Sequence, residues 1–468
     1  MEYGAMAAQT KLRNLPGVDT LLQMSDCQDW IEQYGHALVV EAVRLAVADA
    51  RRELLQGGDV PSPEALIERA ARHLRLLTRP TLGPAINATG VIVHTNLGRA
   101  PLCQDALAAM AAVGRGYSNL EYDLDAGRRG SRYVHAEQLL CRLSGAEAAL
   151  VVNNNAGAVF LALIALAQGR EVVISRGQLV EIGGGFRIPD VMRQSGARLV
   201  EVGTTNRTHL RDYAQAITPD TAMLMLAHQS NFRITGFTTQ VGARELVELG
   251  RTHNLVVYED LGSGTLLPTE KYGFTHEPTV QEVIAAQVDL VSFSGDKLLG
   301  APQAGILVGK QEIIARLRHF PLTRALRVDK TTLAGLQATL LHYLKGDAGR
   351  AIPVWQMASM PLDVLKRRAR RWKTKLVAGG VDARVVAGRS MAGGGSLPGE
   401  TLPTWLLVVA PPAPNTFTAR LRAASPPIIA RIENDLVCFD PRTVFVEQEK
   451  PLLGAILAAW LGDTSTPK

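Results

Sequence analysis

The chain of 468 residues contains few cysteines and few aromatic residues. Its four cysteines (Cys27, Cys103, Cys141 and Cys438) lie far apart and form no CxxC or CxxH motif. This spacing indicates neither a zinc site nor a disulfide framework, and we expect no metal in the protein. Reduced cysteines also favour a cytoplasmic location. Aromatic residues make up only 5% of the chain, a composition that suits helices packed on a parallel sheet.

The sequence also lacks a long apolar run and a strong charge of one sign. The longest apolar run, residues 156–167, has 12 residues, and a helix needs about 20 to cross a bilayer. No apolar signal core is present near the start of the chain. We therefore expect a soluble protein without a membrane partner. The 50 Lys and Arg against 44 Asp and Glu give +6, which permits an anionic partner but does not demand one.

Three regions differ in their residue pattern. Residues 1–80 show only helical periodicity, as in Leu66, Ala70, Leu74 and Leu77, and Ser62-Pro63 is typical of a helix start. The prolines at 80 and 84 mark a linker. We predict an N-terminal helical domain (1–80), a large domain (81–330) and a small C-terminal α+β domain (331–468).

The second region alternates short β-branched runs with helix-length segments. Such alternation predicts βαβ units and a mostly parallel sheet, so the fold class is α/β. Ligands on such sheets bind beyond the carboxyl ends of the strands, and the residues that follow each strand are therefore candidates for the site. The predicted strands are 149–152, 171–175, 199–202, 223–227, 255–258, 288–293 and 305–308.

The most distinctive segment, residues 291–305, reads VSFSGDKLLGAPQAG. An apolar strand ends in Ser294-Gly295-Asp296-Lys297, and a glycine-rich turn leads into another apolar strand. A lysine at a strand end can be partly desolvated, which lowers its pKa and makes its amine a nucleophile. Most lysines in turns are exposed instead. Two other segments of the sequence decide whether Lys297 is a reactive, partly buried lysine or an ordinary exposed one.

The first companion is Asp260, which follows the predicted strand 255–258. A pyridoxal cofactor needs a carboxylate beside its ring nitrogen, which keeps that nitrogen protonated. Taken alone, an N-cap aspartate is the simpler interpretation of Asp260.

The second companion is the segment VVNNNAGA, residues 151–158, which leads into an apolar helix. Asn154, Asn155, Ala156 and Gly157 would place unpaired N–H groups and a positive helix end at a phosphate. An ordinary asparagine cap explains the segment equally well on its own. A phosphate loop, then an acid, then a lysine, in this order along the chain, together favour a pyridoxal phosphate site.

Several arginines could bind an oxyanion. Arg99 lies in the segment HTNLGR, and Arg324 and Arg327 are three residues apart, which on a helix puts both guanidinium groups on one face. A surface role is the more common one for any single arginine. Spacing alone does not show that these three converge.

Long blocks of the sequence resemble bacterial selenocysteine synthases, the L-seryl-tRNA(Sec) selenium transferases. The resemblance extends over nearly the whole chain. It is carried by LPGVD (15–19), INATGVIVHTNLGR (86–99), YSNLEY (117–122), GTTNRTH (203–209), SFSGDK (292–297), GGGSLP (393–398) and RIE (431–433).

The resemblance implies a fold-type-I pyridoxal-phosphate enzyme, like aspartate aminotransferase, with an N-terminal helical domain that binds tRNA. It implies that Lys297 is the Schiff-base lysine and that Asp296 is its active-site neighbour. Arg99, Arg324 and Arg327 correspond to the arginines that hold the selenium donor.

The implied reaction converts L-seryl-tRNA(Sec) to L-selenocysteinyl-tRNA(Sec) with selenophosphate, through a cofactor-bound aminoacrylyl-tRNA intermediate. The implied assembly is a homodecamer, a ring of dimers, in the cytoplasm. Two alternatives remain at this point. One is a related α,β-eliminating lyase that acts on a free small amino acid or amino sugar, which would not need residues 1–80. The other is a tRNA-binding protein on an inactive enzyme scaffold, which would not need Lys297 and Asp260.

Overall fold

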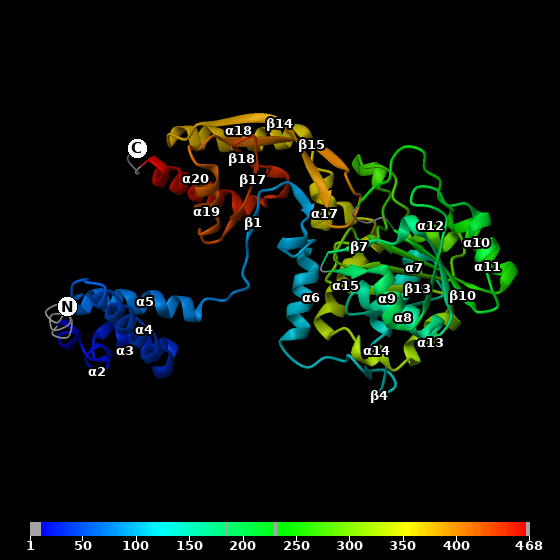
Figure 1. Cartoon of the computed structure of the whole chain (residues 1–468), viewed down its shortest axis with the longest axis horizontal. Helices are drawn as coiled ribbons and strands as arrows, with labels where there is room; N and C mark the ends of the chain where they lie inside the picture. The colour runs from blue at the N-terminus through cyan, green and yellow to red at the C-terminus, as the bar shows by residue number, and fades with distance from the viewer. Residues whose placement is uncertain (1–10, 184, 229–231, 465–468) are drawn as a thin grey trace. The chain divides into compact units, whose positions relative to one another are not determined.

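The computed structural model describes residues 11–183, 185–228 and 232–464. The chain divides into two compact units, Met1–Pro84 and Ala85–Lys468 (Figure 1). Among the described residues, no helix is long and apolar enough to cross a membrane. The finer division of the chain at residues 80/81 and 330/331 stays a prediction.

The first unit is a small bundle of helices. Helix α5 (Pro63–Thr78) begins as the sequence predicts, because Ser62 Oγ accepts a hydrogen bond from the Ala65 N–H at 3.2 Å and Pro63 opens the first turn. Leu66 and Leu74 are buried in its core, but Leu77, also expected there, is 41% exposed because it lies in the last turn of the helix. The helices are α2 (Val18–Leu22), α3 (Ser25–Tyr34), α4 (His36–Leu55) and α5 (Pro63–Thr78).

The second unit is built on a seven-stranded sheet, which confirms the α/β class (Figure 1). All seven predicted strands are present, and within this sheet only β13 (Gly305–Gly309) runs antiparallel to its neighbours. Most of these strands are buried along their whole length, which explains their continuous apolar sequences. In sheet order they are β5 (Ala148–Val152), β13 (Gly305–Gly309), β12 (Leu290–Ser294), β11 (Val256–Gly262), β10 (Thr221–Ala227), β6 (Glu171–Ser175) and β9 (Arg198–Val202).

Helices cover both faces of this sheet, and each face has its own apolar core. One core includes side chains of α8 (Asn155–Ala167), α9 (Ile188–Ser195) and α13 (Gln311–His319). The opposite core includes side chains of α7 (Val134–Ser144), α10 (Leu210–Ala216), α11 (Ala243–His253), α12 (Val280–Ala285) and α15 (Lys330–Lys345). Because both faces are covered, the carboxyl-end edge of the sheet is where a small molecule can reach strand-end residues.

A five-stranded sheet near the C-terminus includes strands that are far apart in sequence. Its order is β17 (Arg431–Glu433), β18 (Leu436–Phe439), β15 (Thr401–Val409), β14 (Ala383–Gly393) and β2 (Val91–Val93). Strand β1 (Ile86–Asn87) pairs in parallel with β16 (Ile428–Ile429). Residues 86–93 therefore pair with strands that lie close to the chain's C-terminus.

The remaining elements connect or cover these sheets. The helices are α6 (Gln104–Gly114), α14 (Leu322–Ala325), α16 (Ala348–Ala351), α17 (Pro353–Ala358), α18 (Leu362–Ala378), α19 (Pro414–Arg422) and α20 (Glu449–Thr464). The short strand pairs are β3 (Tyr122–Asp123) with β4 (Arg128–Arg129), and β7 (Glu181–Ile182) with β8 (Phe186–Arg187). The 3-10 turns are η1 (Thr95–Leu97), η2 (Arg176–Gln178), η3 (Thr269–Tyr272), η4 (Pro441–Thr443) and η5 (Val446–Gln448).

Candidate active site

Lys297 lies in the turn that follows β12, and it is 4% exposed. Its Nζ donates a hydrogen bond to the Gly395 carbonyl at 3.2 Å. Burial lowers the pKa of the Lys297 amine, although the charge of Asp260 acts in the opposite direction. A lowered pKa raises the fraction of neutral amine, the form that can act as a nucleophile or as a base. Ser294, the last residue of β12, is also buried.

Asp260 lies on the neighbouring strand β11 and is 5% exposed. Its Oδ1 accepts hydrogen bonds from Asn155 Nδ2 at 2.9 Å, from Ser292 Oγ at 3.2 Å and from the Gly262 N–H at 3.2 Å. All three donors reach the same oxygen, and among the described residues no hydrogen bond to Oδ2 is seen. A protonated ring nitrogen is a donor of the kind that such a buried carboxylate binds.

The segment before α8 differs in one respect from its predicted form. The helix begins at Asn155, so Asn155, Ala156 and Gly157 form its first turn rather than a loop. Asn154 caps this helix, because its Oδ1 accepts a hydrogen bond from the Gly157 N–H at 2.7 Å. The close approach of β13 requires glycine at position 305, where a Cβ would come within 2.1 Å of the Asn154 carbonyl oxygen.

These residues fit pyridoxal phosphate. The N–H groups of Asn155 and Ala156 have no helical acceptor and can bind a phosphate, whereas the Gly157 N–H is bonded to Asn154 Oδ1. Asn155 links this turn to Asp260, and its own buried Oδ1 has no hydrogen-bond partner among the residues that the structure describes. The N-terminus of α8, a buried carboxylate and a buried amine therefore meet at one edge of the sheet.

The predicted arginines occupy different surroundings. Arg99 follows η1 with a backbone φ of 64°, and its Nη1 donates to both carboxylate oxygens of Asp296, at 3.0 and 2.8 Å. Asp296, which is 7% exposed, thus joins Arg99 to the turn that carries Lys297. Such a φ is rare outside glycine and is often found at functional sites.

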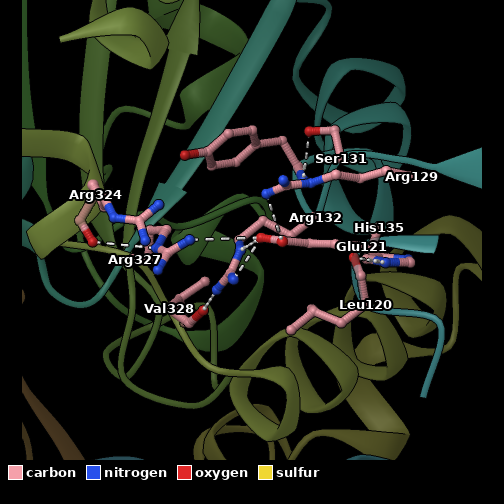
Figure 2. A network of polar contacts seen from close by, with 10 residues as sticks. Leu120, Glu121, Arg129, Ser131, Arg132, His135, Arg324, Arg327 and Val328 are labelled. Carbon is pink, nitrogen blue, oxygen red and sulfur yellow. Dashed lines mark hydrogen bonds and ion pairs between the residues drawn. The ribbon is translucent and has the colours of Figure 1, made fainter. Parts of the chain in front are cut away.

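Arg324 and Arg327 do not share a helix face as the spacing suggested. Arg324 is in α14, which ends at Ala325, whereas Arg327 lies beyond that end. Arg327 Nε donates to the Arg324 carbonyl at 3.2 Å (Figure 2). A cleft of about 780 Å³ is lined by Arg99, Asp296 and Arg327, but Arg324 is not among its lining residues. Two of the three predicted arginines therefore lie at one cleft beside the Lys297 turn.

Several residues of this site were not predicted from the sequence. Ser292 and Gly395, which contact Asp260 and Lys297, were not predicted as site residues. Ser292 faces the same side of β12 as Ser294, so alternation along the strand is a signal that could have identified it. Gly395 lies nearly one hundred residues from Lys297, and no local pattern indicates that contact. Nor did sequence reasoning single out Glu121, which lies 3.6 Å from Arg327.

Two models of known protein families match this chain. The family model described as L-seryl-tRNA selenium transferase matches residues 85–445. The chain belongs to this family. A second model, described as selenocysteine synthase N terminal, matches residues 12–51 and so extends the family assignment into the first unit.

Relatives within the L-seryl-tRNA selenium transferase family match over almost their full length. The L-seryl-tRNA(Sec) selenium transferase of Desulfomicrobium baculatum is 49% identical over 456 residues, which cover 95% of this chain and 98% of that protein. The protein of the same name from Moorella thermoacetica is 49% identical over 466 residues, 98% of each chain. Among solved structures, D-glucosaminate-6-phosphate ammonia-lyase has a TM-score of 0.58 at 20% identity. The match covers 82% of this chain and 97% of the ammonia-lyase chain, and it supports the fold alone.

Proposed function

We propose that this chain converts L-seryl-tRNA(Sec) to L-selenocysteinyl-tRNA(Sec), with pyridoxal phosphate as cofactor and selenophosphate as selenium donor. The observation that supports this most strongly is the family match, which includes residues 12–51 as well as 85–445. The buried Lys297 beside Asp260 supports an active enzyme rather than an inactive scaffold.

Each of these groups has a task in the proposed reaction. Pyridoxal phosphate, when bound, supplies a ring that delocalises the negative charge left at the α-carbon of the seryl group. Lys297 anchors the cofactor and then, as a neutral amine, accepts the α-proton. Asp260 keeps the ring nitrogen protonated, and Asn155 and Ser292 hold its carboxylate in place. Asn154, Ala156 and Gly157 belong to the helix end that binds the phosphate.

The chemistry at the β-carbon uses the cleft that Arg99 and Arg327 line. The seryl hydroxyl takes up a proton and leaves as water. The selenium of selenophosphate then bonds to the β-carbon, the α-carbon regains a proton, and water cleaves the P–Se bond to release phosphate. We infer that the two guanidinium groups hold the phosphate oxygens of the donor while this bond forms. Arg324, outside this cleft, would approach the donor only if its side chain moved.

We also propose that the protein works in the cytoplasm as a homo-oligomer, a decameric ring of dimers. Large apolar side chains are exposed at nearby positions along the chain, before and within the β3–β4 hairpin, at Tyr117, Tyr122 and Leu124. Exposed apolar patches of this kind commonly mark protein–protein contacts.

The arginine assignment can be tested by kinetics with seryl-tRNA(Sec) and varied selenophosphate. Arg99→Ala or Arg327→Ala is expected to raise the KM for selenophosphate about tenfold or more, because each removes a charge-assisted hydrogen bond. Arg324→Ala is expected to have a smaller effect. Cofactor absorbance should be retained in all three variants. An unchanged KM for selenophosphate in both Arg99→Ala and Arg327→Ala would show that the donor binds elsewhere.

A further inference from the structure

Glu121 lies at the centre of a cluster of arginines (Figure 2). One of them, Arg327, lines the cleft proposed above for the selenium donor. Glu121 Oε1 accepts hydrogen bonds from Arg132 Nε at 2.8 Å and from Arg132 Nη2 at 2.6 Å. Arg129 Nη2 lies 3.5 Å from Oε2, and Arg327 Nη1 lies 3.6 Å from Oε1. One carboxylate therefore organises three guanidinium groups, each from a different position in the chain.

Arg132 fixes the geometry of this cluster. Its remaining terminal nitrogen, Nη1, donates to the Val328 carbonyl at 2.9 Å. Arg132 is 13% exposed in its side chain, and Val328 is buried. Arg132 thus ties Glu121 to the backbone next to Arg327, and the carboxylate is held at a defined place beside that guanidinium.

Arg327 keeps hydrogen-bonding capacity for a ligand. Its Nη1 is 3.6 Å from Glu121, which is an ion-pair distance but longer than a good hydrogen bond. Its Nε is used by the Arg324 carbonyl. Within residues 11–183, 185–228 and 232–464, its two terminal nitrogens make no hydrogen bond, and the side chain lines the cleft with Arg99. The ion pair therefore orients Arg327 and leaves its terminal N–H groups free to bind an oxyanion.

The charges of the cluster are compatible with an anionic ligand. The hydrogen bond from Arg132 lowers the pKa of Glu121, so the carboxylate is charged at neutral pH. Three cations face this single anion, and the positive charge that remains favours a phosphate or a related oxyanion.

We propose that Glu121 is a positioning residue for the donor site, where its carboxylate, clamped by Arg132, orients the Arg327 guanidinium toward the cleft. This inference rests on the proposed function, because it assumes that Arg327 binds the selenium donor. Glu121 itself does not touch the donor.

The direction in which Glu121→Gln changes the KM for selenophosphate distinguishes a positioning role from an effect of charge alone. Glu121→Gln removes a negative charge next to an anion site. If charge alone mattered, this change would strengthen donor binding and lower the KM for selenophosphate. If Glu121 orients Arg327, the lost ion pair lets the guanidinium leave its position, and the KM rises. A merely structural role would instead lower thermal stability and affect both substrates.

The experiment measures steady-state kinetics of the full chain with selenophosphate and seryl-tRNA(Sec) varied in turn. For Glu121→Gln we expect the KM for selenophosphate to rise about fivefold, which corresponds to a partly exposed ion pair. The KM for seryl-tRNA(Sec) and the thermal unfolding midpoint should change little. Glu121→Asp keeps the charge but shortens the side chain, and it should also raise the KM for selenophosphate. Glu201→Gln is a matched control, since it removes the exposed Arg176–Glu201 ion pair.

The Arg327→Ala variant distinguishes a wrong donor-site assignment from a wrong positioning role for Glu121. If it leaves the KM for selenophosphate unchanged, the donor-site assignment is wrong and the role of Glu121 is overturned with it. If Arg327→Ala raises that KM but Glu121→Gln lowers it or leaves it unchanged, the donor site stands and the positioning role of Glu121 is overturned. If Glu121→Gln raises it together with Arg327→Ala while Glu201→Gln has no effect, the inference is supported.

Discussion

Replacement of Lys297 by alanine is expected to abolish turnover and the visible absorption band of the lysine-bound cofactor, while the protein stays folded. The physical reason is that this buried amine has two tasks, cofactor attachment and proton transfer from the α-carbon. Removing a general base alone costs about 100- to 10,000-fold in rate, and loss of covalent attachment adds to that. Absorbance spectra, a seryl-tRNA(Sec) conversion assay and far-UV circular dichroism measure the three expected results.

Lys310→Ala provides a matched control for this substitution. Lys310 follows β13, pairs with Asp289 at 2.6 Å and has a side chain that is 43% exposed. We expect Lys310→Ala to keep both the band and the activity, because an exposed ion pair contributes little. A visible band that persists in Lys297→Ala would mean that another lysine anchors the cofactor.

A chain that starts at Thr81 is expected to keep its fold and bound cofactor but to lose about 100-fold or more in affinity for seryl-tRNA(Sec), because phosphate contacts dominate nucleic-acid affinity. The division at Pro84 leaves the second unit whole in this shortened chain. A lyase for free amino acids or amino sugars would not depend on the removed residues. This measurement therefore also separates the two enzymatic interpretations of the sequence.

The first unit offers cations that could meet RNA phosphates. Within the described part of this unit, Arg69 and Arg52 are paired with Glu53 and Asp49. Arg72, Arg75 and Arg79 are exposed and, among the described residues, make no ion pair. Phosphate contacts of this kind would make binding by the full-length chain weaken as salt rises.

Fluorescence anisotropy with labelled seryl-tRNA(Sec) at two salt concentrations can measure this loss. Equal affinity of the shortened and full-length chains would place the RNA site in the second unit. The first surface to examine would then be α18, where Arg370, Lys373 and Lys375 are exposed while Arg368 is buried against Glu449.

The central sheet could be predicted because its signal is local. Most of its strands are short, largely apolar runs bounded by turn residues, the pattern that burial on both faces requires. The pairing of β1 and β2 with strands near the C-terminus could not be predicted, because it joins Ile86 to Ile428 across the sequence. A two- or three-residue strand carries no periodicity, and only the folded chain brings such segments together.

The part of the site that could be predicted from the sequence consists of characteristic residue types at the ends of strands. Lys297 follows β12, and Asp260 lies near the carboxyl end of the adjacent strand β11, positions that the topology of a parallel sheet brings together. Arg324 and Arg327 show the limit of spacing arguments. Their separation suggested one helix face, but α14 ends between them, so that only Arg327 lines the cleft with Arg99. Helix ends of this kind are the least reliable part of a sequence pattern.

The measurement that tests the central claim most directly is selenium transfer by the purified, pyridoxal-phosphate-loaded full-length chain. Seryl-tRNA(Sec) and selenophosphate labelled with radioactive selenium are incubated with the enzyme, and the amino acid released from the tRNA is identified. We predict labelled selenocysteine from the unaltered chain and none from Lys297→Ala. Unlabelled serine on the tRNA after incubation with the unaltered, cofactor-loaded chain would contradict the proposed function.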